Sequence, residues 1–270
     1  MPTAQAGEIS LEYYTEGSGP PLLLVMGFAG SAHSWGQPFI DELTKRFTVT
    51  RFSNRGTGES DRPQDQTTIR MMADDAVALL DTLGISKTHV CGISMGGYIA
   101  QEIAINYPDR VNGLVLGCTG VGGTKAVPAD AATMQAMTFD ANLTPPEMIR
   151  RSWYALVSDS FTENNNGFLE GMLESFLRWP TPLDTIMKQV MAIGGSSTVD
   201  RAKTIAAPTL VIHGDVDRLV PPPNGDNLHA EIAGSELRRI PGVGHMFFWE
   251  KPDESAGIVT EFLARVPAEV

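Results

Sequence analysis

The segment from Val90 to Gly97 reads Val-Cys-Gly-Ile-Ser-Met-Gly-Gly and contains the pattern Gly-x-Ser-x-Gly. It predicts a buried strand that ends at Cys91, then a very tight turn, then a helix. A turn from a strand directly into a helix forces Ser94 into a strained backbone conformation and leaves no room for a Cβ at Gly92 or Gly96. The pattern therefore presents a hydroxyl group at the end of a strand, beside the unpaired N–H groups of a helix N-terminus.

Three fixed positions out of five also occur by chance in glycine-rich loops, so the flanking sequence has to decide. Apolar and β-branched residues from Thr88 to Cys91 fit a buried strand, and residues from Tyr98 to Tyr107 fit a long helix. This context favours a serine nucleophile at position 94 over a chance match.

Composition and charge narrow the class of protein. A chain of 270 residues with 42% hydrophobic content suits one large α/β domain or a domain with an insertion. The net charge of −12 argues against nucleic acid and anionic membranes as partners. No signal peptide or membrane span is predicted, and Cys91 and Cys118 lie in apolar runs. We therefore expect two buried free thiols in a cytoplasmic protein, without a disulfide framework.

Strand and helix patterns alternate along most of the chain. The predicted strands cover residues 9–15, 22–26, 47–52, 88–91, 111–118, 209–213 and 237–240. The predicted helices cover residues 35–46, 71–83, 98–107, 224–232 and 252–265. Continuous apolar runs are typical of strands that are buried on both faces. The order predicts an α/β fold, with a mostly parallel central sheet and helices on both faces.

The alternation breaks between residues 120 and 200, where helical patterns occur without a buried strand. We expect residues 1–119 and 201–270 to form the core domain and residues 120–200 to form a helical cap inserted into it. The insertion leaves from the carboxyl end of a strand, which is where folds of this kind bind ligands. This position favours a lid over Ser94, with flexible methionines that shape an apolar pocket, although methionines also serve as ordinary core filler.

A serine hydroxyl needs a base to take its proton, and the base needs an acid to orient it. Among the five histidines, His245 lies in a glycine-rich loop after the last predicted strand. His33 follows the first glycine-rich loop and could line a pocket, whereas the other three fall in strand or helix patterns. Two acids, Asp215 and Asp217, follow the strand 209–213, and the chain order serine, aspartate, histidine fits a Ser-His-Asp triad. An aspartate-rich turn is also common after strands.

Five loops together make the sequence resemble the α/β-hydrolase superfamily over nearly its whole length. They are Gly27-Phe28-x-Gly30, Arg55-Gly56-x-Gly58-x-Ser60, the turn from Gly92 to Gly97, Gly214-Asp215-x-Asp217-x-x-Val220-Pro221 and Gly244-His245. Their order and spacing are specific for the superfamily, but not for a substrate. The resemblance is nearest to small cofactor-free carboxylesterases, enol-lactonases and haloperoxidase-like esterases.

The resemblance implies Ser94 as the nucleophile, Asp217 as the acid and His245 as the base. Family members carry the acid at the second aspartate of its loop, so Asp217 is preferred over Asp215. The resemblance also implies an oxyanion hole made by the backbone N–H groups of Phe28 and Met95.

Two positions depart from the family pattern. The family often has His-Gly before the oxyanion loop, whereas this chain has Met26-Gly27. Because the donor is a backbone N–H group, we expect the chemistry to survive this change. The second departure is Ser53, which stands where an aspartate usually precedes the Arg55 loop, so a structural hydrogen bond or ion pair should differ there.

We therefore predict a serine hydrolase that cleaves a small-to-medium carboxylic ester or lactone through an acyl-enzyme. No metal or nucleotide cofactor is predicted, because no ligand cluster has metal-binding spacing and no dinucleotide fingerprint is present. A carbon–carbon bond hydrolase of ring-cleavage diketones is an alternative. In such an enzyme, Arg150, Arg151 or Arg178 could hold an acidic substrate. The plainer interpretation is that these arginines lie on the solvated surface. A non-catalytic ligand-binding homologue is a further alternative. The physiological substrate and the oligomeric state do not follow from the sequence.

Overall fold

The computed structural model describes residues 2–267, and an eight-stranded sheet forms the centre of this part of the chain. The strands are β1 (Thr3–Ala6), β2 (Ile9–Gly17), β3 (Pro21–Val25), β4 (Thr48–Phe52), β5 (Thr88–Ile93), β6 (Val111–Gly117), β7 (Thr209–Gly214) and β8 (Glu236–Ile240). Their spatial order is β1-β2-β4-β3-β5-β6-β7-β8. The strands from β4 to β8 in this order run parallel to one another. Strand β2 runs antiparallel to both of its neighbours, β1 and β4. The predicted mostly parallel sheet is confirmed.

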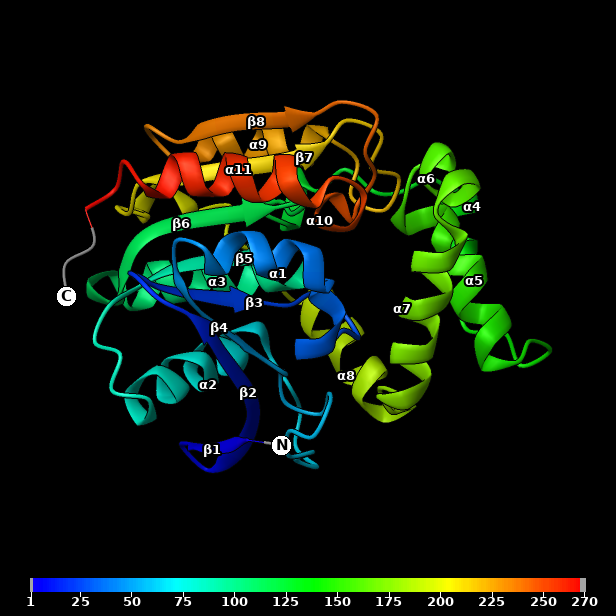
Figure 1. The fold of residues 1–270 in the computed structure, drawn as a ribbon, viewed down its shortest axis with the longest axis horizontal. Coiled ribbons are helices and arrows are strands. Elements are labelled where there is room, and N and C mark those ends of the chain that lie inside the picture. The colour runs from blue at the N-terminus through cyan, green and yellow to red at the C-terminus, as the bar shows by residue number, and fades with distance from the viewer. Residues whose placement is uncertain (1, 268–270) are drawn as a thin grey trace.

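Helices cover both faces of the sheet (Figure 1). They are α1 (Gln37–Thr44), α2 (Ile69–Thr82), α3 (Met95–Asn106), α4 (Ala131–Met137), α5 (Pro145–Leu156), α6 (Asp159–Asn164), α7 (Asn166–Arg178), α8 (Leu183–Gly194), α9 (Pro223–Glu231), α10 (Phe247–Glu250) and α11 (Pro252–Leu263). Helices α1 and α11 lie on one face of the sheet, and α2, α3 and α9 lie on the other. The arrangement is the predicted α/β layering.

Successive side chains of a central strand point to opposite faces of the sheet, and here both sets are buried. In β3, Leu22 and Leu24 belong to the apolar core that includes α1 and α11, whereas Leu23 and Val25 belong to the core that includes α2, α3 and α9. None of these four residues is accessible to solvent. This double burial is why the sequence shows a continuous apolar run in place of strict alternation.

Helices α4 to α8, which we call the inserted helices, occupy the stretch between β6 and β7. They lie beyond the carboxyl ends of the parallel strands, at one end of the sheet (Figure 1). The described residues between β6 and β7 form no strand, only an isolated bridge between Gly122 and Ser197. This agrees with the helical pattern seen in the sequence.

Some boundaries differ from the sequence prediction. Strand β5 continues through Ile93, two residues beyond the predicted end at Cys91, so the turn is concentrated at Ser94. Strand β1 has no clear signal in the sequence, because it has four residues at the sheet edge, of which only Ala6 is buried. Helix α10 is likewise too short to show a helical period.

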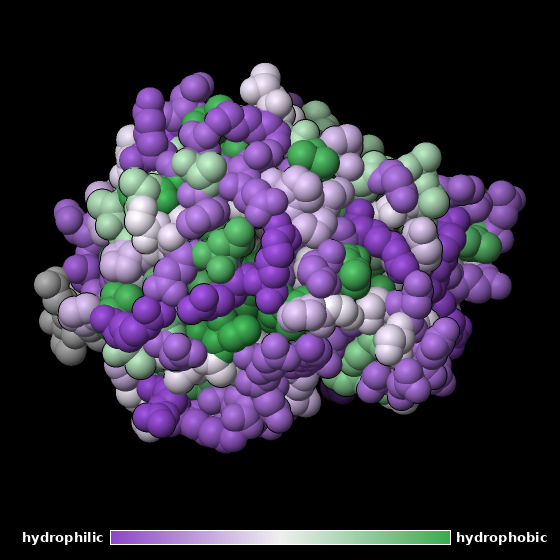
Figure 2. Space-filling model, turned by 90° about the horizontal axis from the view of Figure 1, so that it is seen from above, coloured by the Kyte–Doolittle hydropathy of each residue, from purple (hydrophilic) through white to green (hydrophobic). Residues whose placement is uncertain are grey.

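The surface is consistent with the strongly acidic composition. Hydrophilic residues cover most of the face seen in Figure 2, and apolar residues reach it only in separate areas. Among residues 2–267, no helix is both long enough and apolar enough to cross a membrane.

Candidate active site

The tight turn at Ser94 joins β5 directly to α3. Ser94 has φ 53° and ψ −122°, a conformation that a residue with a side chain rarely adopts. A Cβ on Gly92 would lie 2.1 Å from the carbonyl oxygen of Gly96, and one on Gly96 would lie 2.0 Å from that of Val25. Both distances are far inside van der Waals contact, so glycine is required at both positions. Ser94 itself is half-buried between buried neighbours, which leaves its side chain accessible.

The neighbouring strand β6 and the residues after it hold this strained turn in place. The N–H group of Ser94 donates a hydrogen bond to the carbonyl oxygen of Gly117 at 2.8 Å. The hydroxyl group of Thr119 donates to the carbonyl oxygen of Ser94 at 2.9 Å. A strained residue persists only when its surroundings fix it on several sides, as they do here.

The loop after β3 lies beside Ser94. A Cβ built on Gly27 would lie 3.6 Å from Ser94 Oγ. Phe28 follows Gly27 in this loop, and Met95 is the first residue of α3, where a backbone N–H group has no acceptor within its own helix. The two N–H groups implied by the family resemblance therefore belong to segments that flank the serine hydroxyl.

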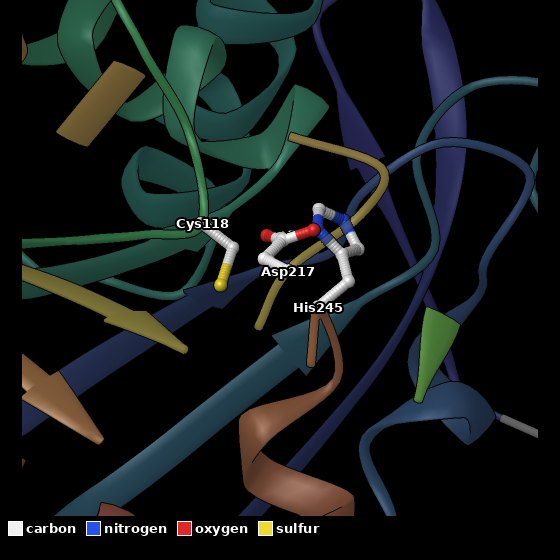
Figure 3. A group of neighbouring side chains, drawn as sticks. All are labelled: Cys118, Asp217 and His245. Atoms are coloured by element: carbon white, nitrogen blue, oxygen red, sulfur yellow. Dashed lines mark hydrogen bonds and ion pairs between the residues drawn. The ribbon is translucent and has the colours of Figure 1, made fainter. Parts of the chain in front are cut away.

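Asp217 and His245 form a hydrogen-bonded pair (Figure 3). Asp217 lies in the loop after β7 and His245 in the loop after β8, and both side chains are buried. His245 Nδ1 lies 2.8 Å from Asp217 Oδ2. An aspartate that accepts a hydrogen bond from Nδ1 holds the imidazole so that Nε2 is free to take a proton.

Cys118 lies beside this pair, directly after β6. Strands β5 and β6 pair in parallel up to their last residues, so Ser94 and Cys118 follow the ends of neighbouring strands. The Cys118 thiol, the Asp217 carboxylate and the His245 imidazole lie within 4.8 Å of one another (Figure 3). The structure thus gathers residues from positions 94, 118, 217 and 245 at one edge of the sheet.

The environment of Asp217 favours its ionised form. Burial alone would raise the pKa of this carboxyl group, but the charge of a protonated His245 and hydrogen bonds from His213 and His245 outweigh it. The net effect holds the pKa of Asp217 well below its usual range. The N–H group of Val220 also donates to Asp217 Oδ1 at 2.9 Å. An ionised Asp217 can stabilise a positive charge on His245.

The structure distinguishes the two aspartates that the sequence offers as candidates. Asp215 is exposed, and its carboxylate accepts a hydrogen bond from the N–H group of Gly242 at 2.6 Å. Gly242 lies in the loop that precedes His245, so the hydrogen bond from Gly242 to Asp215 stabilises this loop. Of the two acids, Asp217 is the one that contacts the imidazole.

Cys118 was expected to be a buried thiol, but sequence analysis did not place it at the site. Burial and the nearby negative charge of Asp217 raise the pKa of this thiol well above its usual value. A protonated thiol is a poor nucleophile and a poor metal ligand. The 2.8 Å hydrogen bond between His245 and Asp217 also leaves no room for an ion between them. The only sequence signal for Cys118 is its position at the end of a predicted strand.

Glu250, on α10, supports the loop that carries His245. Its carboxylate accepts hydrogen bonds from the N–H groups of Gly244 at 2.7 Å and Ser158 at 3.1 Å. Burial raises the pKa of Glu250, and these hydrogen bonds act in the opposite direction. Sequence reasoning missed Glu250, because its partner Ser158 lies 92 residues away in the inserted helices.

The departure from the family pattern at Ser53 is compensated by a carboxylate from another strand. Ser53 Oγ donates to Glu12 Oε2 at 2.7 Å and accepts a hydrogen bond from the N–H group of Ala32 at 3.0 Å. Glu12, on β2, is fully buried and also lies 2.9 Å from His33 Nε2. Burial raises the pKa of Glu12, but hydrogen bonds from His33, Ser53 and other groups prevail and lower it to about 2.

The arginines considered as a clamp for an acidic substrate are engaged elsewhere or lie at the surface. Arg150 makes two hydrogen bonds to the carboxylate of Glu170, at 2.9 and 2.7 Å. Arg151 pairs with Asp140 at 3.4 Å, and Arg178 is exposed. This placement agrees with the plainer interpretation of solvated surface arginines.

Comparison with known proteins agrees with the geometry. A family model described as the alpha/beta hydrolase fold matches residues 20–252. The chain belongs to this family. The α/β-hydrolase fold predicted from the sequence is therefore confirmed, and we class the protein as a hydrolase.

Several relatives of this α/β-hydrolase span nearly the whole chain. A 2-hydroxymuconate semialdehyde hydrolase from Pseudomonas sp. (strain CF600) is 30% identical over 279 residues, covering 97% of this chain and 93% of the relative. The enol-lactonase from Burkholderia xenovorans LB400 has a TM-score of 0.84 at 24% identity, covering 98% of this chain and 100% of that one. A thermophilic esterase from Thermogutta terrifontis has a TM-score of 0.81 at 27% identity, covering 97% of each chain. The different activities in these names show that the fold alone does not determine the substrate.

Proposed function

We propose that this hydrolase cleaves a small-to-medium carboxylic ester or lactone with Ser94, His245 and Asp217 as its catalytic triad. The observation that carries the proposal is the buried hydrogen bond of 2.8 Å between Asp217 and His245, at the same sheet edge as the strained Ser94. Similarity to the esterase from Thermogutta terrifontis supports the substrate class.

In the proposed reaction, His245 Nε2 takes the proton of Ser94 Oγ while this oxygen attacks the carbonyl carbon. The oxyanion that forms accepts hydrogen bonds from the backbone N–H groups of Phe28 and Met95. His245 then gives its proton to the leaving oxygen, and Asp217 stabilises the imidazolium in between. Water, deprotonated by His245, finally hydrolyses the acyl-enzyme and restores Ser94.

We also propose that residues 120–200 form a cap over this site. The inserted helices lie beyond the carboxyl ends of the strands, as a cap must (Figure 1). They also touch the loop of the proposed base, since the N–H group of Met246 donates to the carbonyl oxygen of Leu156 at 2.9 Å. The shape of these helices would then set the size of the acyl or alcohol group that is accepted.

Hydrolysis of p-nitrophenyl acetate, butyrate and octanoate by the wild type and by Ser94→Ala tests this proposal. We expect kcat to fall by about 10⁴-fold or more in the variant, because a triad acts as a unit. Ser160→Ala, on the exposed side of α6, is the matched control and should keep the wild-type rate. The rates with the three acyl chain lengths indicate how large an acyl group the site accepts.

A Ser94→Ala variant that keeps most of the wild-type rate would contradict the serine mechanism. A wild-type protein that cleaves none of the esters should still react with a fluorophosphonate probe at Ser94 if the triad is competent. Failure of both reactions would favour the non-catalytic ligand-binding alternative.

A carbon–carbon bond hydrolase is the second candidate. The 30% identity to a 2-hydroxymuconate semialdehyde hydrolase favours it, and a serine could serve this reaction as well. The ion pairs of Arg150 and Arg151 count against it, because these cations already have carboxylate partners. A rate with a ring-cleavage dienoate far above that with p-nitrophenyl butyrate would decide for this candidate.

A further inference from the structure

The oxyanion loop is fastened to the inserted helices at one residue, Ala29. Its N–H group donates to Gln189 Oε1 at 2.8 Å, and its carbonyl oxygen accepts from Thr181 Oγ1 at 2.8 Å. Gln189 lies on α8, and Thr181 comes two residues before this helix. Ala29 has φ 55°, which is unfavourable for a residue with a Cβ, so these two bonds help to hold a strained loop.

The side of α8 that faces the core buries two polar residues, Thr185 and Gln189, together with Ala192. Thr185, between Thr181 and Gln189 at a spacing of four residues, is buried against the Arg55 loop, since a Cβ on Gly56 would lie 2.6 Å from its side chain. Within α8, this spacing puts Thr185 and Gln189 on the same face of the helix. The opposite side of α8 carries exposed apolar residues, namely Leu183, Met187, Val190 and Met191. Helix α8 therefore meets the loops of the core through Thr185 and Gln189, while Ala192 and Ile193 near its C-terminal end pack against the apolar core.

Gln189 uses only half of its hydrogen-bonding capacity. The residue is 1% exposed, and its Nε2 group has no hydrogen-bond partner among the described residues. An unpaired buried amide lowers stability, and an apolar side chain of similar length would avoid that cost. The favourable contact that a glutamine supplies at this position is the bond from Oε1 to the Ala29 N–H group.

We propose that Gln189 and Thr181 are positioning residues of the oxyanion hole. They hold the peptide groups on both sides of Ala29, so the N–H group of the preceding residue, Phe28, keeps its direction toward the reacting oxygen. A cap that moves away breaks both bonds, and the hole is then complete only while α8 is in place. This inference rests on the proposed function, because it assigns the Phe28 N–H group to transition-state stabilisation.

Three variants and one control test the proposal with p-nitrophenyl butyrate. Thr181→Val and Gln189→Met each remove one bond with little change in volume, and Thr181→Ser keeps the hydroxyl group. We expect the first two to lower kcat about tenfold with KM nearly unchanged, since misplacing a group by about 1 Å costs up to about 10²-fold. Thr181→Ser should recover most of the rate. Met187→Gln, on the exposed side of α8, should match the wild type.

Thermal unfolding separates positioning from a merely structural role. Gln189→Met also removes an unpaired buried amide, so its melting temperature should equal or exceed that of the wild type while kcat falls. A variant that loses stability and KM together, without a selective loss of kcat, would overturn the proposal.

Hydrogen exchange at the Ala29 amide measures the hydrogen bond to Gln189 directly, without relying on enzyme activity. Exchange should be faster in Gln189→Met than in the wild type and unchanged in Met187→Gln. The positioning role alone is overturned if exchange is unchanged in Gln189→Met. It is also overturned if the wild type is active and kcat is unchanged in both Thr181→Val and Gln189→Met. A wild type that neither hydrolyses esters nor labels with fluorophosphonate at Ser94 overturns the proposed function, and the positioning role with it.

Discussion

Strands β5 and β6 bury every residue, whereas helix α8 exposes four large apolar side chains and buries Thr185 and Gln189. The sheet is held by apolar packing that continues into the helices on both faces. Helix α8 is attached to the core loops by single polar contacts, at Ala29 and at Pro63, whose carbonyl oxygen accepts from Lys188 at 2.8 Å. The strands that lead to Ser94 are thus held by apolar packing on both faces, whereas α8 meets the loops beside Ser94 through individual hydrogen bonds.

The inserted helices nevertheless touch the loops on both sides of the site. Thr181 and Gln189 bind the oxyanion loop, while Ser158 binds Glu250, which in turn holds the loop of His245. Because single hydrogen bonds open more easily than a packed core, we expect α8 to move more readily than the strands. The following predictions test this contrast.

The largest effect should come from the acid at the sheet edge. Asp217→Asn should lower kcat about 10⁴-fold, because the imidazole loses the carboxylate that orients it and stabilises its charge. Asp215→Asn is the matched control, two residues away and exposed, and should stay within about threefold of the wild type. Steady-state kinetics with p-nitrophenyl butyrate measures both variants. A greater loss in Asp215→Asn would reverse the assignment of the acid.

The second prediction compares the packing of a sheet strand, β3, with that of the exposed side of α8. Leu24→Ala removes a fully buried side chain from β3 and should lower the free energy of unfolding by about 2–5 kcal/mol. Met191→Ala, on the exposed side of α8, should change it by less than about 0.5 kcal/mol. Urea denaturation followed by circular dichroism measures both. Equal losses would contradict the contrast between the packed strands and the exposed side of α8.

A third prediction concerns acid stability. The pKa of Glu12 is lowered from 4.5 to about 2 in the folded chain, so its contribution to stability is fully present above about pH 4.5 and is lost as the pH falls toward 2. Glu12→Gln should therefore be less stable at pH 7 and lose less stability between pH 4.5 and 2.

Unfolding by urea at a series of pH values measures that difference. Glu8→Gln, at an exposed position near the same strand, is the control and should follow the wild-type profile. Parallel acid profiles of the wild type and Glu12→Gln would contradict the stabilising role of the ionised Glu12.

The smallest effect should follow from loosening the cover near the base. Ser158→Ala removes the hydroxyl group that caps α6 and bonds Glu250, and should lower the free energy of unfolding by about 1 kcal/mol. The backbone N–H group of residue 158 still binds Glu250, so kcat should change less than about threefold. Ser160→Ala serves again as the control. A loss of kcat near that of Asp217→Asn would mean that the cover and the edge are not independent.

The sequence predicted the parts of this molecule that depend on local pattern. The parallel strands follow from continuous apolar runs, and the turn at Ser94 follows from two glycines that a short segment requires. The loops that carry Asp217 and His245 were located because they follow predicted strands, and parallel strands bring their carboxyl ends to one edge. Their catalytic roles and the boundaries of the cap remain predictions.

Other parts could not be predicted, because they depend on contacts between distant segments. Gln189 binds a residue 160 positions away, and nothing in its own helix distinguishes it from other glutamines. Glu12 is a buried carboxylate and Glu250 is a half-buried one, and the partners of both come from other elements. A sequence pattern shows the hydrophobic periodicity of one segment. It does not show which side chain of a distant segment will form a hydrogen bond with a buried carboxylate.

The backbone at Ser94 has a practical consequence for engineering. Its geometry is imposed by glycine contacts and by β6, and Cys118 shows that a cysteine in this chain also adopts a positive φ, at 43°. Ser94→Cys should therefore keep the same backbone and place a half-buried thiol at the floor of the site. A fluorescent dye attached there would test, one molecule at a time, whether the inserted helices move relative to the sheet in solution.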